Sequence, residues 1–385
     1  MKAKYFRVAV LSPLIVLAAS CGGGSSTSST KVNPMPACTP ATPPPHAYVL
    51  NGISANTVSM YRVDSCTGKL TATSPATVST GGNEFGAEEM AVDPAGKFAY
   101  VANLMSNATD LATIAMYTVD SSTGILIPTN PPTVPTGFFP QGIAIDPFGK
   151  FVYTANSDDN TVSMFTINQS TGILTPTTPP TVATGWSPLS VTVDPSSRFA
   201  YVANQDDDTI SMYTINANTG VLTATTPATV PTGFSPFGVT VDPVGKFAYV
   251  PNAYDSRNTV SQYTIDSSTG VLTPNTPDTA TTGNQPTWVA VDPSSKFAYV
   301  VNRGDSTVWE YTINSVNGAL APNGTLATGQ EPFRITVDPS GSFAYVVNES
   351  GSVSIYTLGS NGTLSAAGSE ETSGPLSVAI VGSKH

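Results

Sequence analysis

Three residues of the sequence have side chains suited to acid–base and anion-binding chemistry, and they stand at equivalent places in an otherwise regular pattern. Glu89, Trp288 and Arg334 each lie near the start of an apolar stretch that ends in Asp-Pro. A guanidinium can hold a carboxylate or a developing oxyanion, an indole can stack on a ring, and a carboxylate can activate water. Together they would suit the hydrolysis of a carbonyl compound or the capture of an anionic ligand.

The same three residues also fit a purely structural role. Glu89 and Arg334 could pair across a central channel that Trp288 plugs, because structural ion pairs are common. The sequence leaves both interpretations open. Ser190 and Ser377 stand at the same place in two other repeats, and we add them, with Arg303 of a neighbouring predicted loop, as candidate ligand-binding residues.

The elements that would position these residues are seven copies of one repeat. A segment of the type FAYVAN occurs seven times, with its tyrosines separated by 52, 53, 48, 48, 50 and 46 residues. Six copies follow a VxVDP segment, and each is followed by a run like TVSMYTI and then a Thr-Gly or Asn-Gly turn. A repeat of this length is typical of a four-stranded propeller blade. The tyrosines are Tyr48, Tyr100, Tyr153, Tyr201, Tyr249, Tyr299 and Tyr345.

The first two predicted strands of each repeat are apolar on both faces. In one repeat Phe98 and Tyr100 point one way, whereas Ala99 and Val101 point the other. A strand that is buried on both faces must be covered on both, as when twisted sheets stack around an axis. The hairpin between these strands reads Asp-Pro-x-Gly-Lys, and its glycine, such as Gly96, is free to adopt a positive φ.

The two ends of the repeat region predict how the ring closes. The first repeat begins at its second strand, over 46–49, and the chain finishes with an isolated inner strand over 377–381. We therefore predict an all-β, seven-bladed β-propeller of four-stranded antiparallel blades over 46–385. Three N-terminal strands and one C-terminal strand would complete the first blade, which leaves no sheet edge exposed.

The segments AVDPAGKFAYVAN, TVSMYTI and STGILT resemble those of the YVTN and lactonase-like seven-bladed propellers. That family includes 6-phosphogluconolactonase and fungal carboxymuconate-lactonising enzymes, and the resemblance covers about 46–385. It implies lactone hydrolysis or cyclisation by a histidine, an arginine and an acid near the channel mouth. This chain has only His46 and His385, and the topology places both on the opposite face. A lactonase mechanism would therefore have to work without histidine, with Glu89 as the base.

The N-terminus is predicted to be a targeting signal. Lys2, Lys4 and Arg7 precede an apolar stretch over 8–19, which is too short to span a bilayer because spanning takes about 20 residues. The following LAASC segment resembles the lipobox of bacterial lipoproteins. We predict a lipoprotein signal peptide over 1–20, a lipid on Cys21, and a flexible Gly/Ser/Thr/Pro tether over 21–45. Ordinary cleavage that leaves a spare thiol is the alternative.

This signal and the charge of the chain limit its location and partners. We expect an exported, membrane-anchored protein that faces the periplasm or the cell surface. The outer membrane is favoured because Gly22 stands where inner-membrane retention in enterobacteria uses Asp. The formal net charge is −11, and removal of 1–20, with three basic and no acidic residues, makes it −14. Such a surface repels nucleic acids and anionic headgroups, so we predict no nucleic-acid partner, membrane contact through the lipid alone, and a monomer.

Cysteines and aspartates complete the candidate sites. Topology places Cys38 and Cys66 on the face opposite the mouth, where an oxidising compartment favours a disulfide over two free thiols. Adjacent carboxylates at 158–159 and 206–208 could hold Ca²⁺. They lack the alternating spacing of a calcium loop, and Asx turns explain them. We therefore predict no metal ligands and no cofactor.

Three functions are consistent with these observations. The preferred hypothesis is an exported, lipid-anchored propeller that binds a small molecule or a protein at the mouth of its channel. The alternative is a lactone hydrolase or cyclase that works without histidine. The third is a structural or adhesive protein of the cell envelope, which would use blade surfaces rich in Thr, Ser and Asn.

Overall fold

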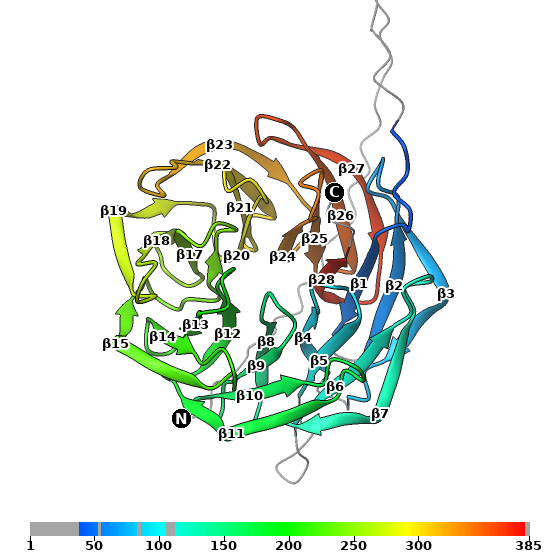
Figure 1. Cartoon of the computed structure of the whole chain (residues 1–385). Coiled ribbons are helices and arrows are strands. Elements are labelled where there is room, and N and C mark those ends of the chain that lie inside the picture. The colour runs from blue at the N-terminus through cyan, green and yellow to red at the C-terminus, as the bar shows by residue number, and fades with distance from the viewer. Residues whose placement is uncertain (1–37, 53–54, 83–85, 105–111, 382–385) are drawn as a thin grey trace, which may run out of the picture. The chain divides into compact units, whose positions relative to one another are not determined.

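The computed structural model describes residues 38–52, 55–82, 86–104 and 112–381. The chain divides into two compact units, 1–38 and 39–385, and the second holds all of the strands. Within the described residues this unit consists of seven four-stranded antiparallel sheets, arranged as blades around a common centre (Figure 1). None of the described residues forms a helix long and apolar enough to cross a membrane.

Each blade contributes an inner, a second, a third and an outer strand. In order of blades 1 to 7, the inner strands are β28 (Pro375–Val381), β4 (Ala87–Val92), β8 (Pro140–Ile145), β12 (Pro188–Val193), β16 (Thr240–Val241), β20 (Pro286–Val291) and β24 (Pro332–Val337). The second strands are β1 (His46–Asn51), β5 (Phe98–Asn103), β9 (Phe151–Asn156), β13 (Phe199–Asn204), β17 (Phe247–Asn252), β21 (Phe297–Asn302) and β25 (Phe343–Asn348). The third strands are β2 (Thr57–Val63), β6 (Thr113–Val119), β10 (Thr161–Ile167), β14 (Thr209–Ile215), β18 (Thr259–Ile265), β22 (Thr307–Ile313) and β26 (Ser352–Leu358). The outer strands are β3 (Leu70–Ser79), β7 (Leu126–Pro135), β11 (Leu174–Ala183), β15 (Leu222–Pro231), β19 (Leu272–Thr281), β23 (Leu320–Ala327) and β27 (Leu364–Glu371).

The predicted closure of the ring is confirmed. The red C-terminal strand β28 pairs antiparallel with the blue strand β1, with Tyr48 opposite Ala379 (Figure 1). The sheet order β28-β1-β2-β3 therefore completes blade 1 from both ends of the chain. The inner strands also contact one another in the order β28, β4, β8, β12, β16, β20, β24 and back to β28.

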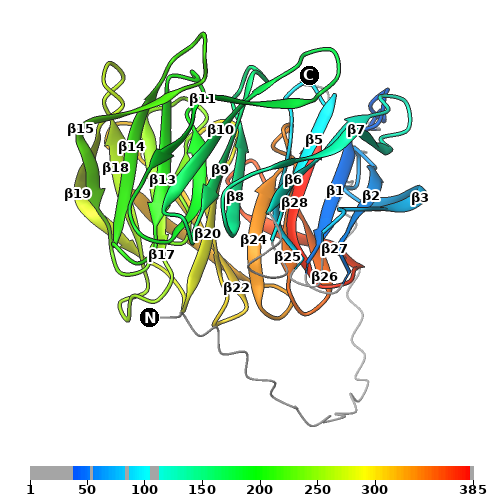
Figure 2. The ribbon, with the colours of Figure 1, turned by 90° about the horizontal axis from the view of Figure 1, so that it is seen from below.

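The strands run between two faces of the propeller (Figure 2). The loops that lead into the inner strands and the loops between second and third strands lie on one face, which we call the mouth face. The hairpins between inner and second strands and the turns between third and outer strands lie on the opposite face, which we call the hairpin face. Each inner strand begins at the mouth face, so its first residues surround the centre of the ring on that face.

Neighbouring blades are joined by the tyrosines of the repeat. The hydroxyl of Tyr153 donates to the Gly220 carbonyl of the next blade at 2.9 Å, and Tyr345 donates to Gly68 at 2.9 Å across the closure. Both tyrosines are fully buried. Burial raises the pKa of both hydroxyls, because the ionised form would lose its hydration. Each blade therefore packs on the next through the same apolar layer and the same buried hydrogen bond.

The hairpins at the ends of the inner strands are held by the aspartate of the Asp-Pro motif. In blade 3, Asp146 Oδ1 accepts the Phe151 N–H at 2.7 Å, while Gly149 adopts a φ of 66°. The predicted positive φ of the hairpin glycine is thus confirmed, and it recurs at Gly96, Gly245 and Gly341. The aspartates of this motif are therefore engaged by backbone N–H groups. Side chains that are free to react have to be sought on the mouth face.

Candidate functional site

In the described residues, a β-bulge lies near the start of six of the seven inner strands, β16 being the exception. In β24 the register shifts between Pro332, which faces Asn348, and Arg334, which faces Val347. The same shift occurs in β4, β8, β12 and β20. A bulge interrupts the alternation of a strand and re-aims its side chains. It therefore sets where the residues at the mouth point.

Side chains that follow the bulge reach toward the next blade of the ring. A Cβ added to Gly142 would lie 2.9 Å from Ser190 Cα, and one added to Gly238 would lie 2.6 Å from Trp288 Cζ3. Glu89 Oε2 accepts the backbone N–H of Ile143 at 3.1 Å, also one blade further on. The two glycines therefore leave room for the strand or the indole that follows them.

The structure brings Glu89, Trp288 and Arg334 together. Arg334 Nη1 donates to Glu89 Oε1 in an ion pair. The Arg334 Cζ lies 4.4 Å from the centroid of the Trp288 ring, which is cation–π geometry. Strand β28 lies between β24 and β4, and its Ser377 occupies the equivalent position. That small side chain is suited to let the guanidinium extend past β28 to the next blade.

This cluster is nearly closed to solvent. The side chains of Arg334 and Glu89 are 8% and 13% exposed. Burial lowers the pKa of Arg334 to about 10, because the charged form loses hydration, whereas the charge of Glu88 acts to raise it. Two carboxylates and a stacked ring therefore offset the cost of burying the guanidinium.

One hydrogen-bond donor of the buried guanidinium, Arg334 Nε, has no acceptor among the described residues. Ser377 Oγ, at the equivalent position of the adjacent inner strand β28, is also buried without a partner there. Buried polar groups without partners are rare in folded proteins and call for an explanation. A carbonyl or carboxylate oxygen of a ligand is a chemical group that would satisfy Arg334 Nε.

Aromatic residues that the sequence analysis missed complete the site. Phe237 and Phe333 meet edge to face, with ring centroids 5.3 Å apart and planes at 83°. Arg334 Cζ lies 5.7 Å from the Phe333 centroid. Glu88 and Phe333 immediately precede the aligned positions in β4 and β24, where the bulge falls, and Phe237 precedes Gly238 ahead of β16. Their place next to Gly238, Arg334 and Glu89 was the signal that could have revealed them.

The remaining candidate residues lie elsewhere or are occupied. Ser190 is buried in β12. Arg303, on the loop between β21 and β22, pairs with Glu349 at 2.7 Å and lies 3.7 Å from Glu331. His46 begins β1 and is buried beside the turn at Gly124, on the hairpin face. Burial, and then the charge of Arg62, lower its pKa. His385 and Cys21 lie outside the described residues.

The loop aspartates hold the loops of the mouth face. Asp159 Oδ2 accepts the Phe138 N–H and Asp207 Oδ2 accepts the Trp186 N–H, each at 2.7 Å. Within the described part of the chain, no group of three or more His, Cys, Asp or Glu side chains is arranged to hold a metal ion. Cys38 and Cys66 are both disulfide-bonded.

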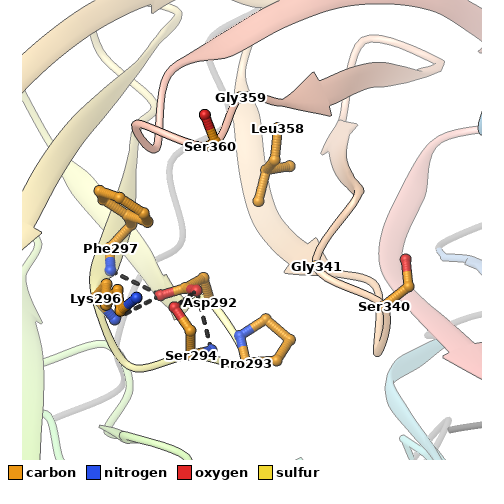
Figure 3. A pocket seen from close by; sticks show the side chains of 10 residues that line it. All are labelled: Asp292, Pro293, Ser294, Lys296, Phe297, Ser340, Gly341, Leu358, Gly359 and Ser360. Atoms are coloured by element: carbon orange, nitrogen blue, oxygen red, sulfur yellow. Dashed lines mark hydrogen bonds between the residues drawn. The ribbon is translucent and has the colours of Figure 1, made fainter. Parts of the chain in front are cut away.

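A cavity of about 400 Å³ lies on the hairpin face between blades 6 and 7 (Figure 3). Its lining includes Asp292, Lys296, Ser340 and Ser360. Asp292 is already engaged, because its Oδ1 accepts the backbone N–H groups of Lys296 and Phe297 at 2.7 Å. This cavity therefore offers less free chemistry than the cluster around Arg334, although it is the more open of the two places.

The family model of the lactonase seven-bladed β-propeller matches residues 42–186 and 187–380. No curated protein matches the sequence at a significant level. The chain is similar to the periplasmic gluconolactonase of Pseudomonas aeruginosa, at 19% identity and a TM-score of 0.71, covering 88% of this chain and 99% of that one.

Two further solved structures have the same fold. A candidate 6-phosphogluconolactonase from Bacteroides uniformis has a TM-score of 0.73 at 22% identity, covering 88% of this chain and 99% of that one. A protein from Lactobacillus plantarum has a TM-score of 0.72 at 18% identity, covering 88% and 100%. At these identities the likeness shows the shared architecture.

Proposed function

The chain belongs to the lactonase family of seven-bladed β-propellers, and from that premise we propose that it hydrolyses a small lactone at the mouth of its channel. The observation that carries the proposal is the unsatisfied donor Arg334 Nε, on a guanidinium that forms a buried ion pair with Glu89. A buried donor without a partner costs about 1–3 kcal/mol. A lactone carbonyl that accepted from Arg334 Nε would remove that cost.

Substrate binding would have to rearrange the ion pair. Both oxygens of Glu89 are occupied, one by Arg334 and the other by the Ile143 N–H. If the lactone carbonyl takes the place of Glu89 Oε1 on the guanidinium, that oxygen is released as a general base. Arg334 then stabilises the oxyanion that develops on the carbonyl oxygen.

The proposed reaction is a hydrolysis with Glu89 as base and then acid. Glu89 takes a proton from water as the water oxygen attacks the carbonyl carbon. The ring C–O bond then breaks, and the leaving oxygen takes the proton back from Glu89. The product is a hydroxy acid, and once its carboxyl group has released its proton to solvent the carboxylate stays on Arg334. No step needs a histidine, which agrees with the position of His46 on the hairpin face.

The surroundings favour a neutral lactone with a ring that can stack. Trp288 and Phe333 both approach the guanidinium, and Phe237 packs on Phe333. Glu88 and Glu89 place two carboxylates at the same spot and would repel a phosphate. We therefore expect aromatic or unmodified sugar lactones to be better substrates than phosphorylated ones.

The test is a pH-stat hydrolysis assay of the full chain on a panel of sugar and aromatic lactones. Arg334→Ala and Glu89→Gln should each lower kcat/KM at least about 100-fold, as loss of an oxyanion donor or a general base does. Arg257→Met is the control, because Arg257 is exposed on the same face and pairs with Asp255. The proposal fails if no lactone is turned over, or if both site variants keep wild-type rates.

A second candidate is a binding module without turnover. It is favoured by the closed state of the site, in which both oxygens of Glu89 are already engaged, so that Glu89 is not free to act as a base. A lactone or hydroxy acid would then raise the melting temperature of the wild type without being hydrolysed. At a ligand concentration of 100 times Kd, the free energy of unfolding should rise by about 2.7 kcal/mol. The same ligand should not stabilise Arg334→Ala.

We also propose that the chain is exported and held in a membrane, the outer membrane being favoured, by a lipid on Cys21. The lipobox-like segment supports this, and so do the disulfide-bonded Cys38 and Cys66, because disulfides persist in oxidising compartments. The similar protein from Pseudomonas aeruginosa is periplasmic. Metabolic labelling with palmitate tests the proposal. Wild type should carry label in the membrane fraction, and label retained by Cys21→Ser would exclude this anchor.

A further inference from the structure

Three consecutive blades present an exposed aromatic side chain at the same place on the mouth face. Phe138, Trp186 and Phe234 each follow the glycine of the turn that leads into β8, β12 or β16. They are 40%, 67% and 59% exposed. The equivalent residues of blades 6 and 7 are Asn284 and Gln330. The fold therefore does not require an aromatic residue here.

The aromatic residues stand on fixed loops. The backbone N–H of Phe138 is held by Asp159 and that of Trp186 by Asp207, each at 2.7 Å. In both cases the aspartate belongs to the loop between the second and third strands of the same blade. Each ring is therefore presented by a backbone whose conformation is set before anything binds, which lowers the entropic cost of binding.

Hydrogen bonds between blades join these loops in series. Asn160 Oδ1 of blade 3 accepts the N–H of Ser187, next to Trp186, at 2.9 Å. Asp208 Oδ1 of blade 4 accepts the N–H of Ser235, next to Phe234, at 2.7 Å. The three aromatic positions thus belong to one continuous, cross-linked stretch of the mouth face.

Unused carboxylates accompany the rings. Asp158 and Asp206 are exposed and stand next to the aspartates that hold the loops, and the N–H of Asp206 lies 3.3 Å from the Trp186 carbonyl. Partial desolvation, and then the charge of Asp159, raise the pKa of Asp158. The ionised form of Asp158 is therefore disfavoured, and a nearby cation would stabilise it. The loops that carry these residues contain no Lys or Arg, over 136–141, 157–160, 184–189, 205–208 and 232–238.

Rings and carboxylates in one place select a cation with an apolar stem. A guanidinium or ammonium can stack on an aromatic face while it pairs with a carboxylate. Exposed aromatic residues on consecutive, hydrogen-bonded loops give a surface of the kind that marks an interaction site. We propose that this aromatic–acidic sector, formed by Phe138, Trp186, Phe234, Asp158 and Asp206, docks a polypeptide segment rich in arginine or lysine.

The negative charge of the sector favours a basic peptide over the other ligands that aromatic rings can bind. A neutral glycan would stack on the rings but would leave the carboxylates without a counter-charge. Nucleic acids and anionic lipid surfaces would be repelled by the same carboxylates and by the net charge of the chain. The surface does not involve Arg334 or Glu89, so the proposal does not depend on lactone hydrolysis.

The test is fluorescence anisotropy of a labelled peptide made of four Arg-Gly-Ser repeats, titrated with the full chain in detergent. The matched probes are the same peptide with Glu for Arg and a neutral labelled glucan oligomer. The test variants are the triple replacement of Phe138, Trp186 and Phe234 by Ser, and the double replacement of Asp158 and Asp206 by Asn. Phe148→Ser is the control, because Phe148 is 62% exposed on a hairpin-face turn.

We expect the arginine peptide to bind the wild type and the Phe148→Ser variant equally. The triple aromatic variant should bind at least about tenfold more weakly. The double Asn variant should bind a few fold more weakly, and its affinity should fall less steeply with salt. Circular dichroism must show both variants folded, as expected for exposed positions.

Four results would overturn the proposal. The first is an arginine peptide that does not bind at all, the second is a glutamate peptide that binds equally well, and the third is an aromatic variant that keeps full affinity. In the fourth result the glucan binds and is lost in the aromatic variant while the arginine peptide fails, which would assign the sector to a polysaccharide.

Discussion

The buried pair of Arg334 and Glu89 should carry a measurable part of the stability of the propeller. Arg334→Met keeps the bulk of the side chain but removes the cation, which leaves the carboxylate of Glu89 with the Ile143 N–H alone, near Glu88. Removal of one partner of a buried pair costs about 3–5 kcal/mol. Loss of the contact with the Trp288 ring adds about 0.5–2 kcal/mol.

These terms give a definite shift in melting temperature. An unfolding entropy of ~2.1 cal/mol/K per residue makes each kcal/mol worth roughly 1.4 °C in a propeller of this length. Arg334→Met should therefore melt about 5–10 °C below the wild type. Glu89→Gln keeps a group that can accept from Ile143, and Arg334 retains Glu88 nearby, so we expect a smaller loss of about 2 kcal/mol.

A double-mutant cycle separates the pair from its surroundings. The double variant, Glu89→Gln with Arg334→Met, should be more stable than the sum of the single losses predicts, by about 1–3 kcal/mol. Urea unfolding and near-ultraviolet circular dichroism melts measure it, with Arg257→Met as the exposed control that should cost under about 1 kcal/mol. Strictly additive losses would refute the reasoning, as would an Arg334→Met variant that melts within a degree of wild type.

Three other changes test the fold around the site. Gly142→Ala places a Cβ against the backbone of β12 and should cost about 1–3 kcal/mol, measured by urea unfolding. Burial raises the pKa of Tyr153 above its ordinary 10.0, so the contribution of this hydroxyl to stability should be constant below pH 10 and fall as the pH rises beyond it. Tyr153→Phe should make that fall shallower in alkaline melts and cost about 1 kcal/mol at pH 7. Burial also raises the pKa of Glu310, which accepts from the Leu364 N–H, so its stabilising effect is present below pH 4.5 and lost above it. Glu310→Gln, which copies Gln262 of the preceding blade, should raise stability by about 1–2 kcal/mol at pH 7 and leave it unchanged at pH 4.

The architecture could be predicted because every blade has its own short-range sequence pattern. The hairpin at Asp146 to Phe151, the apolar second strand and the turn before the outer strand are each a short-range pattern, repeated seven times. The closure followed from counting, since the repeat region begins with a second strand at His46 and its last strand is an inner strand over 375–381. No long-range contact had to be guessed, because the repeat fixes which strand follows which.

The site could be predicted only in part. Alignment of the repeats identified Glu89, Trp288 and Arg334, because they replace small residues at one position. It could not show that the guanidinium extends past β28 to a strand two blades away. Phe333 was missed because strand alternation assigns it to the other face, and the bulge in β24 that overrides this alternation has no distinct pattern in the sequence. Phe237 was missed because it lies ahead of β16 and just before the aligned position, Gly238.

The departures from the repeat differ in how completely the chain itself satisfies them, and that difference locates function. Buried Glu310 is satisfied within the fold, since the Leu364 N–H donates to it. Arg334 is satisfied in part, because Glu89 and Trp288 engage it while its Nε has no acceptor among the described residues. The exposed rings on the loops of blades 3 to 5 have their backbones fixed but their faces in solvent. The hydrogen bond to Glu310 gives that residue a role within the fold, whereas for the other two departures we propose a small ligand at the mouth and a larger partner on the aromatic–acidic sector.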